Sequence, residues 1–269
     1  MQSVQILFAN LMAIYRRELQ SYFASPFAYV IAGVFWLLSG FFFVAILLGP
    51  EGLIAQANFR DQLGMTNPPI DVAAQFVSFF LGTLSSLALF ILPVLSMGLY
   101  AEERKRGTLE LLATSPLTNW IVALGKLLGA LTFFVTLLLP MLIYQTIALS
   151  AANPPAPFTG LLLGHLGLIL LAAAVLSLGM FVSSLTDSTI LAAILTFALV
   201  LFLWVVDLVG NSLVGPVGAG LKHISLIRNY TNFAQGVFDS SSLVVFLSYV
   251  MLGLFLTAQS IEAFRFQRS

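Results

Sequence analysis

Residues 27 to 49 read FAYVIAGVFWLLSGFFFVAILLG, an uninterrupted run without a charged side chain. A helix of this length and apolarity is long enough to cross a hydrocarbon layer about 30 Å thick. The run begins only after Arg16, Arg17 and Glu18, and no short apolar core with a cleavage site precedes it. We therefore expect it to remain in the mature chain as an uncleaved membrane anchor.

Similar apolar blocks recur along the chain. Charged residues make up 8% of the 269 residues and hydrophobic residues 59%, whereas a soluble domain carries about 25% charged residues. The expected spans are 27–49, 76–100, 120–149, 161–183, 188–208 and 243–263. No repeat or linker divides the sequence, so we expect one all-α integral membrane domain over residues 1–269, with six transmembrane helices.

The segment before the first span has a different pattern. Between residues 3 and 23, apolar and aromatic side chains recur at helical spacing, and Arg16 and Arg17 lie on the opposite face. This pattern predicts an amphipathic interfacial helix in the membrane surface. The alternative is an ordinary amphipathic helix that packs on other protein.

The basic residues favour a topology with both termini in the cytoplasm. With the N-terminus inside, the inner segments hold eight Lys and Arg residues and the outer segments hold Arg60, Lys222 and Arg228. The outer segment 209–242 is rich in apolar residues interrupted by Gly and Pro. We expect short helices there that fold back against protein.

Several kinds of chemistry are excluded or disfavoured by the residues present. The chain has no Cys, only His165 and His223 as histidines, and zero net charge, so we expect no metal site and no nucleic-acid partner. The Gly125-Lys126 pair is followed by Leu127, and no phosphate-binding loop is formed. We find no candidate catalytic residues and expect no enzyme activity in this chain.

Energy for any transport must come from outside the chain. Lys126 is the only Lys, Arg, Asp or Glu that lies more than one residue from the end of an expected span, and we expect its side chain to extend to the nearby cytoplasmic surface. An ion-coupled transporter would need a charged group near the midplane, and this sequence offers none.

One polar segment stands out. Residues 101–117 read AEERKRGTLELLATSPL, with charged residues at 102–106 and at Glu110. Gly107 is suited to end one helix, and Thr108 to cap a short helix that stops before Pro116. A helix of about two turns is marginal alone in water, so its leucines need a partner surface. The alternative is a stop-transfer cluster whose leucines dip into the lipid headgroups.

This segment resembles the signature of ABC-2 type permeases, the membrane subunits of ATP-driven exporters. The similar residues are 103–112, Ser115-Pro116-Leu117 and Gly125-Lys126. Ser184-Leu185-Thr186-Asp187 is a second similarity. Asn232-Phe233, Gly236-Val237 and Asp239 are similar to the gliding-motility-type branch of the family.

The resemblance implies a permease that dimerises with a second copy or a related permease, in the lipid bilayer of a bacterial plasma (inner) membrane. It implies no cofactor in this chain, because ATP and Mg would be bound by a cytoplasmic ABC ATPase subunit. The short helix would be a coupling helix seated on that ATPase, and the N-terminal helix with Arg16 and Arg17 would also touch it. The ATPase-coupling residues would be Glu102, Glu103, Arg104, Gly107, Thr108, Leu109, Glu110, Leu112 and Pro116.

A different class of protein fits the same topology. A membrane scaffold or assembly protein would anchor an ATPase or an envelope complex without moving a solute. An exporter differs from it in enclosing a path lined by polar or amphipathic side chains, and the sequence does not name the substrate.

Overall fold

The computed structural model describes residues 2–64, 71–109, 118–152, 158–213 and 215–266, and the regular elements in these ranges are α-helices. They are α1 (Gln2–Ala24), α2 (Pro26–Leu48), α3 (Leu53–Gln62), α4 (Val72–Ser96), α5 (Gly98–Lys105), α7 (Asn119–Ser150), α8 (Phe158–Ser184), α9 (Thr189–Ser212), α10 (Pro216–Ile224), α11 (Leu226–Ala234) and α12 (Ser240–Phe266).

The predicted all-α membrane class is confirmed. Within the described ranges, six helical stretches are long and apolar enough to cross a membrane, and each overlaps one expected span. These stretches are Pro26–Gln62, Val72–Lys105, Asn119–Ser150, Phe158–Ser184, Thr189–Ser212 and Ser240–Phe264.

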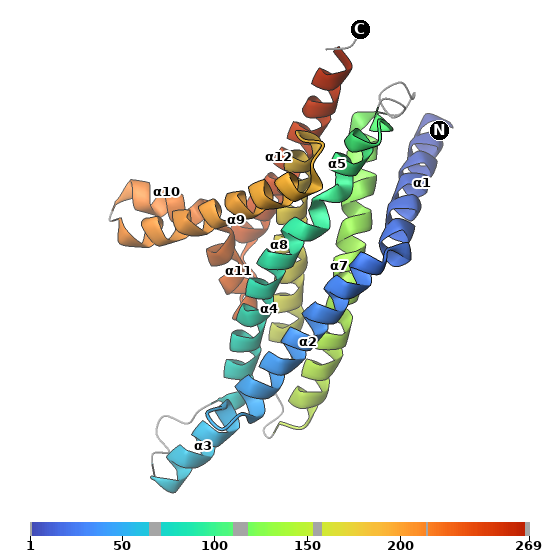
Figure 1. Cartoon of the computed structure of the whole chain (residues 1–269). Helices are drawn as coiled ribbons and strands as arrows, with labels where there is room; N and C mark the ends of the chain where they lie inside the picture. Colours follow the sequence, from blue (N-terminus) through green and yellow to red (C-terminus); the bar gives the residue numbers. More distant parts are fainter. Residues whose placement is uncertain (1, 65–70, 110–117, 153–157, 214, 267–269) are drawn as a thin grey trace.

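Two ends of the helical bundle are distinct in Figure 1. The N-terminal end of α1, the end of α5, the start of α7 and the C-terminal end of α12 lie at one end. Helix α3 lies at the opposite end, within the connection expected outside. Helix α3 was not expected from the sequence, because its polar composition does not resemble that of a membrane span. The arrangement places the charged segment at 102–106 at the same end as both termini.

Helix α8 is the centre of the bundle. In its most apolar stretch 72% of the residues are buried, against 22% to 44% in the other five candidate spans. It packs against α12, α4, α11 and α7. Helix α8 is therefore the most buried of the six candidate spans, and it joins these four helices into one core.

Helix α1 packs along α7. A Cβ atom at Gly125 would lie 2.7 Å from Ile14 Cγ2, and one at Gly129 would lie 2.8 Å from Glu18 Cβ, so only glycine permits this approach. Ile6 and Phe8, farther toward the N-terminus, are 59% and 62% exposed. Packing on protein thus covers part of the apolar face of α1, and its placement at the membrane surface stays a prediction.

The long second span is broken near its end. Pro93 lies inside α4, which ends at Ser96, and α5 starts at Gly98. Ser183 of α8 fills the break: its hydroxyl accepts from the Tyr100 N–H (3.1 Å) and the Ala101 N–H (3.0 Å), and donates to the Met97 carbonyl (2.7 Å). Backbone groups freed by the break are thereby satisfied without water. Helix α7, by contrast, continues through Pro140.

The segment after α9 forms the expected short helices. Helix α11 packs on α8, and Leu226, Tyr230 and Phe233 on its inner face are buried. The prediction of a helix buried against protein within 209–242 is confirmed. Helices α9 and α10 project sideways from the bundle in Figure 1. A cavity lies between α9, α11 and α4.

Candidate functional site

Within the charged segment, helix α5 ends in a tight turn at Gly107. Gly107 has φ +70°, a left-handed conformation that favours glycine, and its N–H donates to the Arg104 carbonyl at 3.2 Å. The Thr108 N–H and hydroxyl both donate to the Glu103 carbonyl, at 2.9 and 3.2 Å. The predicted role of Gly107 as the residue that ends the helix is confirmed.

A buried ion cluster lies just behind this helix end. The Lys126 ammonium of α7 lies 3.0 Å from Glu103 Oε1 of α5 and 3.2 Å from Glu18 Oε2 of α1. It also donates to the Leu99 carbonyl at 2.7 Å and lies 5.1 Å from the Tyr100 ring centre. Lys126 therefore joins three helices that the sequence places far apart. We call Glu18, Glu103 and Lys126 the charge triad.

The charge triad is shielded from water. The Lys126, Glu103 and Glu18 side chains are 6%, 14% and 16% exposed. Burial raises the pKa of Glu18 above its usual value, and the nearby Lys126 charge opposes that rise. Removing one member of such a cluster leaves an uncompensated buried charge. Instead of extending to the surface as expected, Lys126 holds the triad together.

Arg104 fixes the same helix end to the opposite side of the bundle. Its guanidinium donates to the Ser184 carbonyl at 2.9 Å, at the end of α8. It also lies 4.8 Å from the ring centre of Phe264 in α12. The α5 end is thus connected to α1 and α7 through Glu103, and to α8 and α12 through Arg104.

The other predicted coupling residues divide into three groups. Glu102 is exposed and pairs with Arg106 at 3.4 Å, a surface contact that contributes little stability. Leu109 is 2% exposed within the core, so it offers no surface to a partner, which differs from our expectation. Glu103 likewise turns inward. Glu110, Leu112 and Pro116 lie outside the described residues, and Arg16 and Arg17 are exposed on α1.

Sequence reasoning missed Glu18 and Ser183 as organising residues and misplaced the Lys126 head group. A signal was present at Lys126, which lies between Gly125 and Gly129 in an apolar helix. Small residues on both sides permit another helix to approach, and a lysine there needs a counter-charge from that helix. The identity of the approaching helix was not readable from the sequence.

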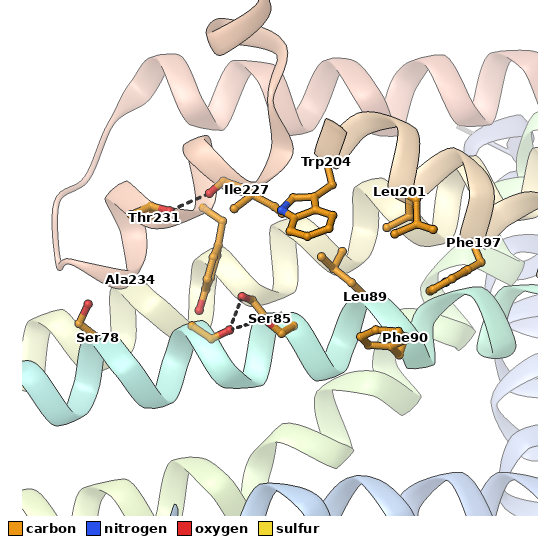
Figure 2. Close-up of a pocket in the computed structure, with 14 residues that line it drawn as sticks. Ser78, Ser85, Leu89, Phe90, Phe197, Leu201, Trp204, Ile227, Thr231 and Ala234 are labelled. Atoms are coloured by element: carbon orange, nitrogen blue, oxygen red, sulfur yellow. Dashed lines mark hydrogen bonds between the residues drawn. The ribbon is translucent and has the colours of Figure 1, made fainter. Parts of the chain in front are cut away.

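The cavity at the side of the bundle has a volume of about 340 Å³. Figure 2 shows Leu201 and Trp204 of α9 directed toward Leu89 of α4, with Ile227 and Thr231 of α11 on the other side. This size falls within the range of small-molecule sites. No sequence pattern identified the cavity, because it depends on the direction in which α9 leaves the bundle.

A comparison with curated proteins finds no match to this sequence. The family described as "ABC-2 family transporter protein" matches residues 61–227. That region includes α4, α5, α7, α8, α9 and α10, and therefore Glu103, Lys126 and most of the cavity wall. The match covers more than half of the chain, which is thus a multi-pass membrane protein belonging to the ABC-2 transporter family.

Proposed function

We propose that this chain is the membrane-spanning permease subunit of an ATP-driven exporter and that the segment after Gly107 docks on a separate cytoplasmic ATPase. ATP and Mg would be bound and hydrolysed by that ATPase. The proposal is supported by family membership and, above all, by the way the α5 end is attached to the bundle.

That attachment suits the transmission of force. The charge triad joins α5 to α1 and α7, and Arg104 joins it to α8 and α12. A displacement of the segment after Gly107 would therefore act on four helices at once rather than on a loose loop. A stop-transfer cluster would need only charges in the headgroup region, without contacts of this kind.

The remaining elements of the proposal follow from family resemblance. The permease would act as a dimer with a second copy or a related permease, in a bacterial plasma (inner) membrane with both termini cytoplasmic. Helix α1, with exposed Arg16 and Arg17, would lie at the inner membrane surface and contact the ATPase. The similarity at 232–239 supports the gliding-motility-type branch.

The test uses two glycines with the same backbone conformation. Gly107 and Gly64 have φ of +70° and +69°, and a Cβ atom at either would meet open space. Valine at either position should impose the same local strain, about 1–2 kcal/mol. Gly107→Val lies at the proposed docking end and Gly64→Val at the opposite end, so the second is a matched control.

The measurements are binding of each variant to the cognate ATPase in lipid nanodiscs and ATP-driven transport in proteoliposomes. We expect Gly107→Val to weaken binding or to separate ATP hydrolysis from transport, and Gly64→Val to leave both unchanged. If both variants behave like the parent chain, the segment after Gly107 is not the coupling element. Normal ATPase binding without any solute movement in the parent chain would instead identify a scaffold.

A further inference from the structure

The cavity between α4, α9 and α11 has a polar end and an apolar end. Along α4, the residues that line it are Ser78, Gly82, Ser85, Ser86, Leu89 and Phe90, in that order. The hydroxyl-bearing residues come first, at helical spacing on one face, and the apolar pair follows. The α9 wall adds only apolar and aromatic side chains, including Phe197, Leu201 and Trp204 (Figure 2).

Four of the five hydroxyl groups on the described lining residues, all but that of Ser78, already donate their protons within the protein. Ser85 and Ser86 both donate to the Gly82 carbonyl, at 2.8 and 3.0 Å. Thr231 donates to the Ile227 carbonyl at 2.9 Å, and Tyr230 donates to the Leu81 carbonyl at 2.8 Å. The free lone pairs of these oxygens remain as acceptors. A molecule in the cavity is therefore recognised best if it brings hydrogen-bond donors.

The described residues that line the cavity include no charged side chain. A carboxylate or phosphate would meet oxygen acceptors without a compensating cation, and an ammonium group would meet no carboxylate. Neutral donors such as the indole N–H of Trp204 do not supply the positive charge that a buried anion requires. The lining thus selects against ionised ligands of either sign.

The cavity opens toward an apolar part of the surface. At its rim, Phe90 is 60% exposed, Trp204 45% and Leu201 39%. The Phe90 and Phe197 rings lie 5.4 Å apart, one from α4 and one from α9. Such a rim admits a molecule already dissolved in the hydrocarbon layer more readily than one in water.

We infer that this cavity binds an uncharged amphiphile with an apolar body and a hydroxyl head, the class of molecule that the exporter would move. The hydroxyl donates to Ser85 or Ser86, and the body lies between Leu89 of α4 and Leu201 and Trp204 of α9. The assignment of this class as the transported one rests on the proposed exporter function; the binding itself does not.

The experiment uses Trp204 as the reporter. The chain contains three Trp residues, so Trp36→Phe with Trp120→Phe leaves Trp204 alone in the full chain, purified in detergent without ATPase. Its fluorescence is titrated with three quenchers that share one brominated alkyl chain and differ in head group: an alcohol, a carboxylate and a quaternary ammonium. Only the alcohol should quench saturably.

Two glycine variants control for access from the detergent. A Cβ atom at Gly82 or at Gly40 of α2 meets open space, but only Gly82 lines the cavity. Gly82→Leu should abolish the saturable phase and Gly40→Leu should retain it. Ser85→Ala with Ser86→Ala keeps the cavity open, and it should weaken alcohol binding about fivefold for each hydrogen bond lost.

Equal quenching by the three head groups, unaffected by Gly82→Leu, would overturn the inference, because the cavity would then be filled by detergent or acyl chains without selection. Absence of saturable quenching by all three probes would also overturn it, since the cavity would then bind none of these head groups. If the alcohol binds saturably but Gly107→Val couples to the ATPase like the parent chain, the binding site is supported and the proposed coupling to an ATPase is rejected. If the alcohol does not bind but ATP hydrolysis drives transport as proposed, only the assignment of the ligand class is rejected.

Discussion

The charge triad shows how one residue can organise an apolar bundle. Lys126 contacts two carboxylates and a backbone carbonyl, although the sequence led us to expect its side chain to extend to the membrane surface. The difference arises because Gly125 and Gly129 let α1 approach closely enough to bring Glu18 into range. A lone lysine in a sequence carries no information about which distant carboxylate it will meet.

Replacement of Lys126 by Met should reveal the triad in stability. Glu18 and Glu103 would lose their shared counter-charge, at a cost of about 3–5 kcal/mol at neutral pH. Burial already raises the folded-state pKa of Glu18, and loss of Lys126 removes what opposes that rise. The folded variant then takes up protons more readily than the unfolded chain, so its stability rises as pH falls through the raised pKa.

Thermal unfolding of detergent-solubilised protein at about pH 5 and about pH 8 measures this effect. We expect the loss of thermal stability in Lys126→Met, relative to the parent chain, to be smaller at the acidic pH. Lys105→Met, which removes an exposed lysine on the neighbouring helix, is the control and should change stability little at either pH. A loss of stability that does not depend on pH would show that the unpaired carboxylates are not its cause.

At the scale of elements, the long apolar helices were predictable because a bilayer demands about 20 apolar residues for each crossing. The break between α4 and α5 was only partly predictable. A proline such as Pro93 removes one hydrogen bond of the helix and disturbs the turn before it, but α4 ends only at Ser96, where Ser183 of α8 supplies the missing hydrogen bonds. The direction of α9 and the cavity beside it depend on contacts between distant helices and left no periodic signal.

Ser183→Ala should destabilise the backbone at the junction between α4 and α5. The substitution leaves two backbone N–H groups and one carbonyl without their partner, at a cost of about 1–3 kcal/mol. Ser248 of α12 is a matched control, since it is exposed and its hydroxyl donates only to the Val244 carbonyl of its own helix. Hydrogen exchange of the Tyr100 and Ala101 amides should accelerate in Ser183→Ala and not in Ser248→Ala; equal exchange would place the stabilisation of the break elsewhere.

At the scale of the whole molecule, the fold keeps the proposed coupling site apart from the proposed binding cavity. The charge triad and Arg104 lie near the end of α5 and the start of α7, and Figure 1 shows these parts of the helices at the same end as both termini. The neutral cavity lies between α4, α9 and α11. Helix α4 and its continuation α5 contribute to both, because α4 lines the cavity and α5 carries Glu103 and Arg104. A movement of α5 could therefore change the shape of the cavity through α4, which precedes it directly in the chain.

This arrangement is useful for ATP-driven transport only if the triad end faces the cytoplasm. The chain has no Cys, so single cysteines at the exposed positions Lys105 and Glu262 and, at the opposite end, Asn58 of α3 report orientation without interference. In intact cells, a membrane-impermeant maleimide should label Asn58→Cys and leave the other two unlabelled until the membrane is opened. Labelling of Lys105→Cys in intact cells would put the charged segment outside, where no ATPase could reach it, and the route from ATP hydrolysis to the cavity would be lost.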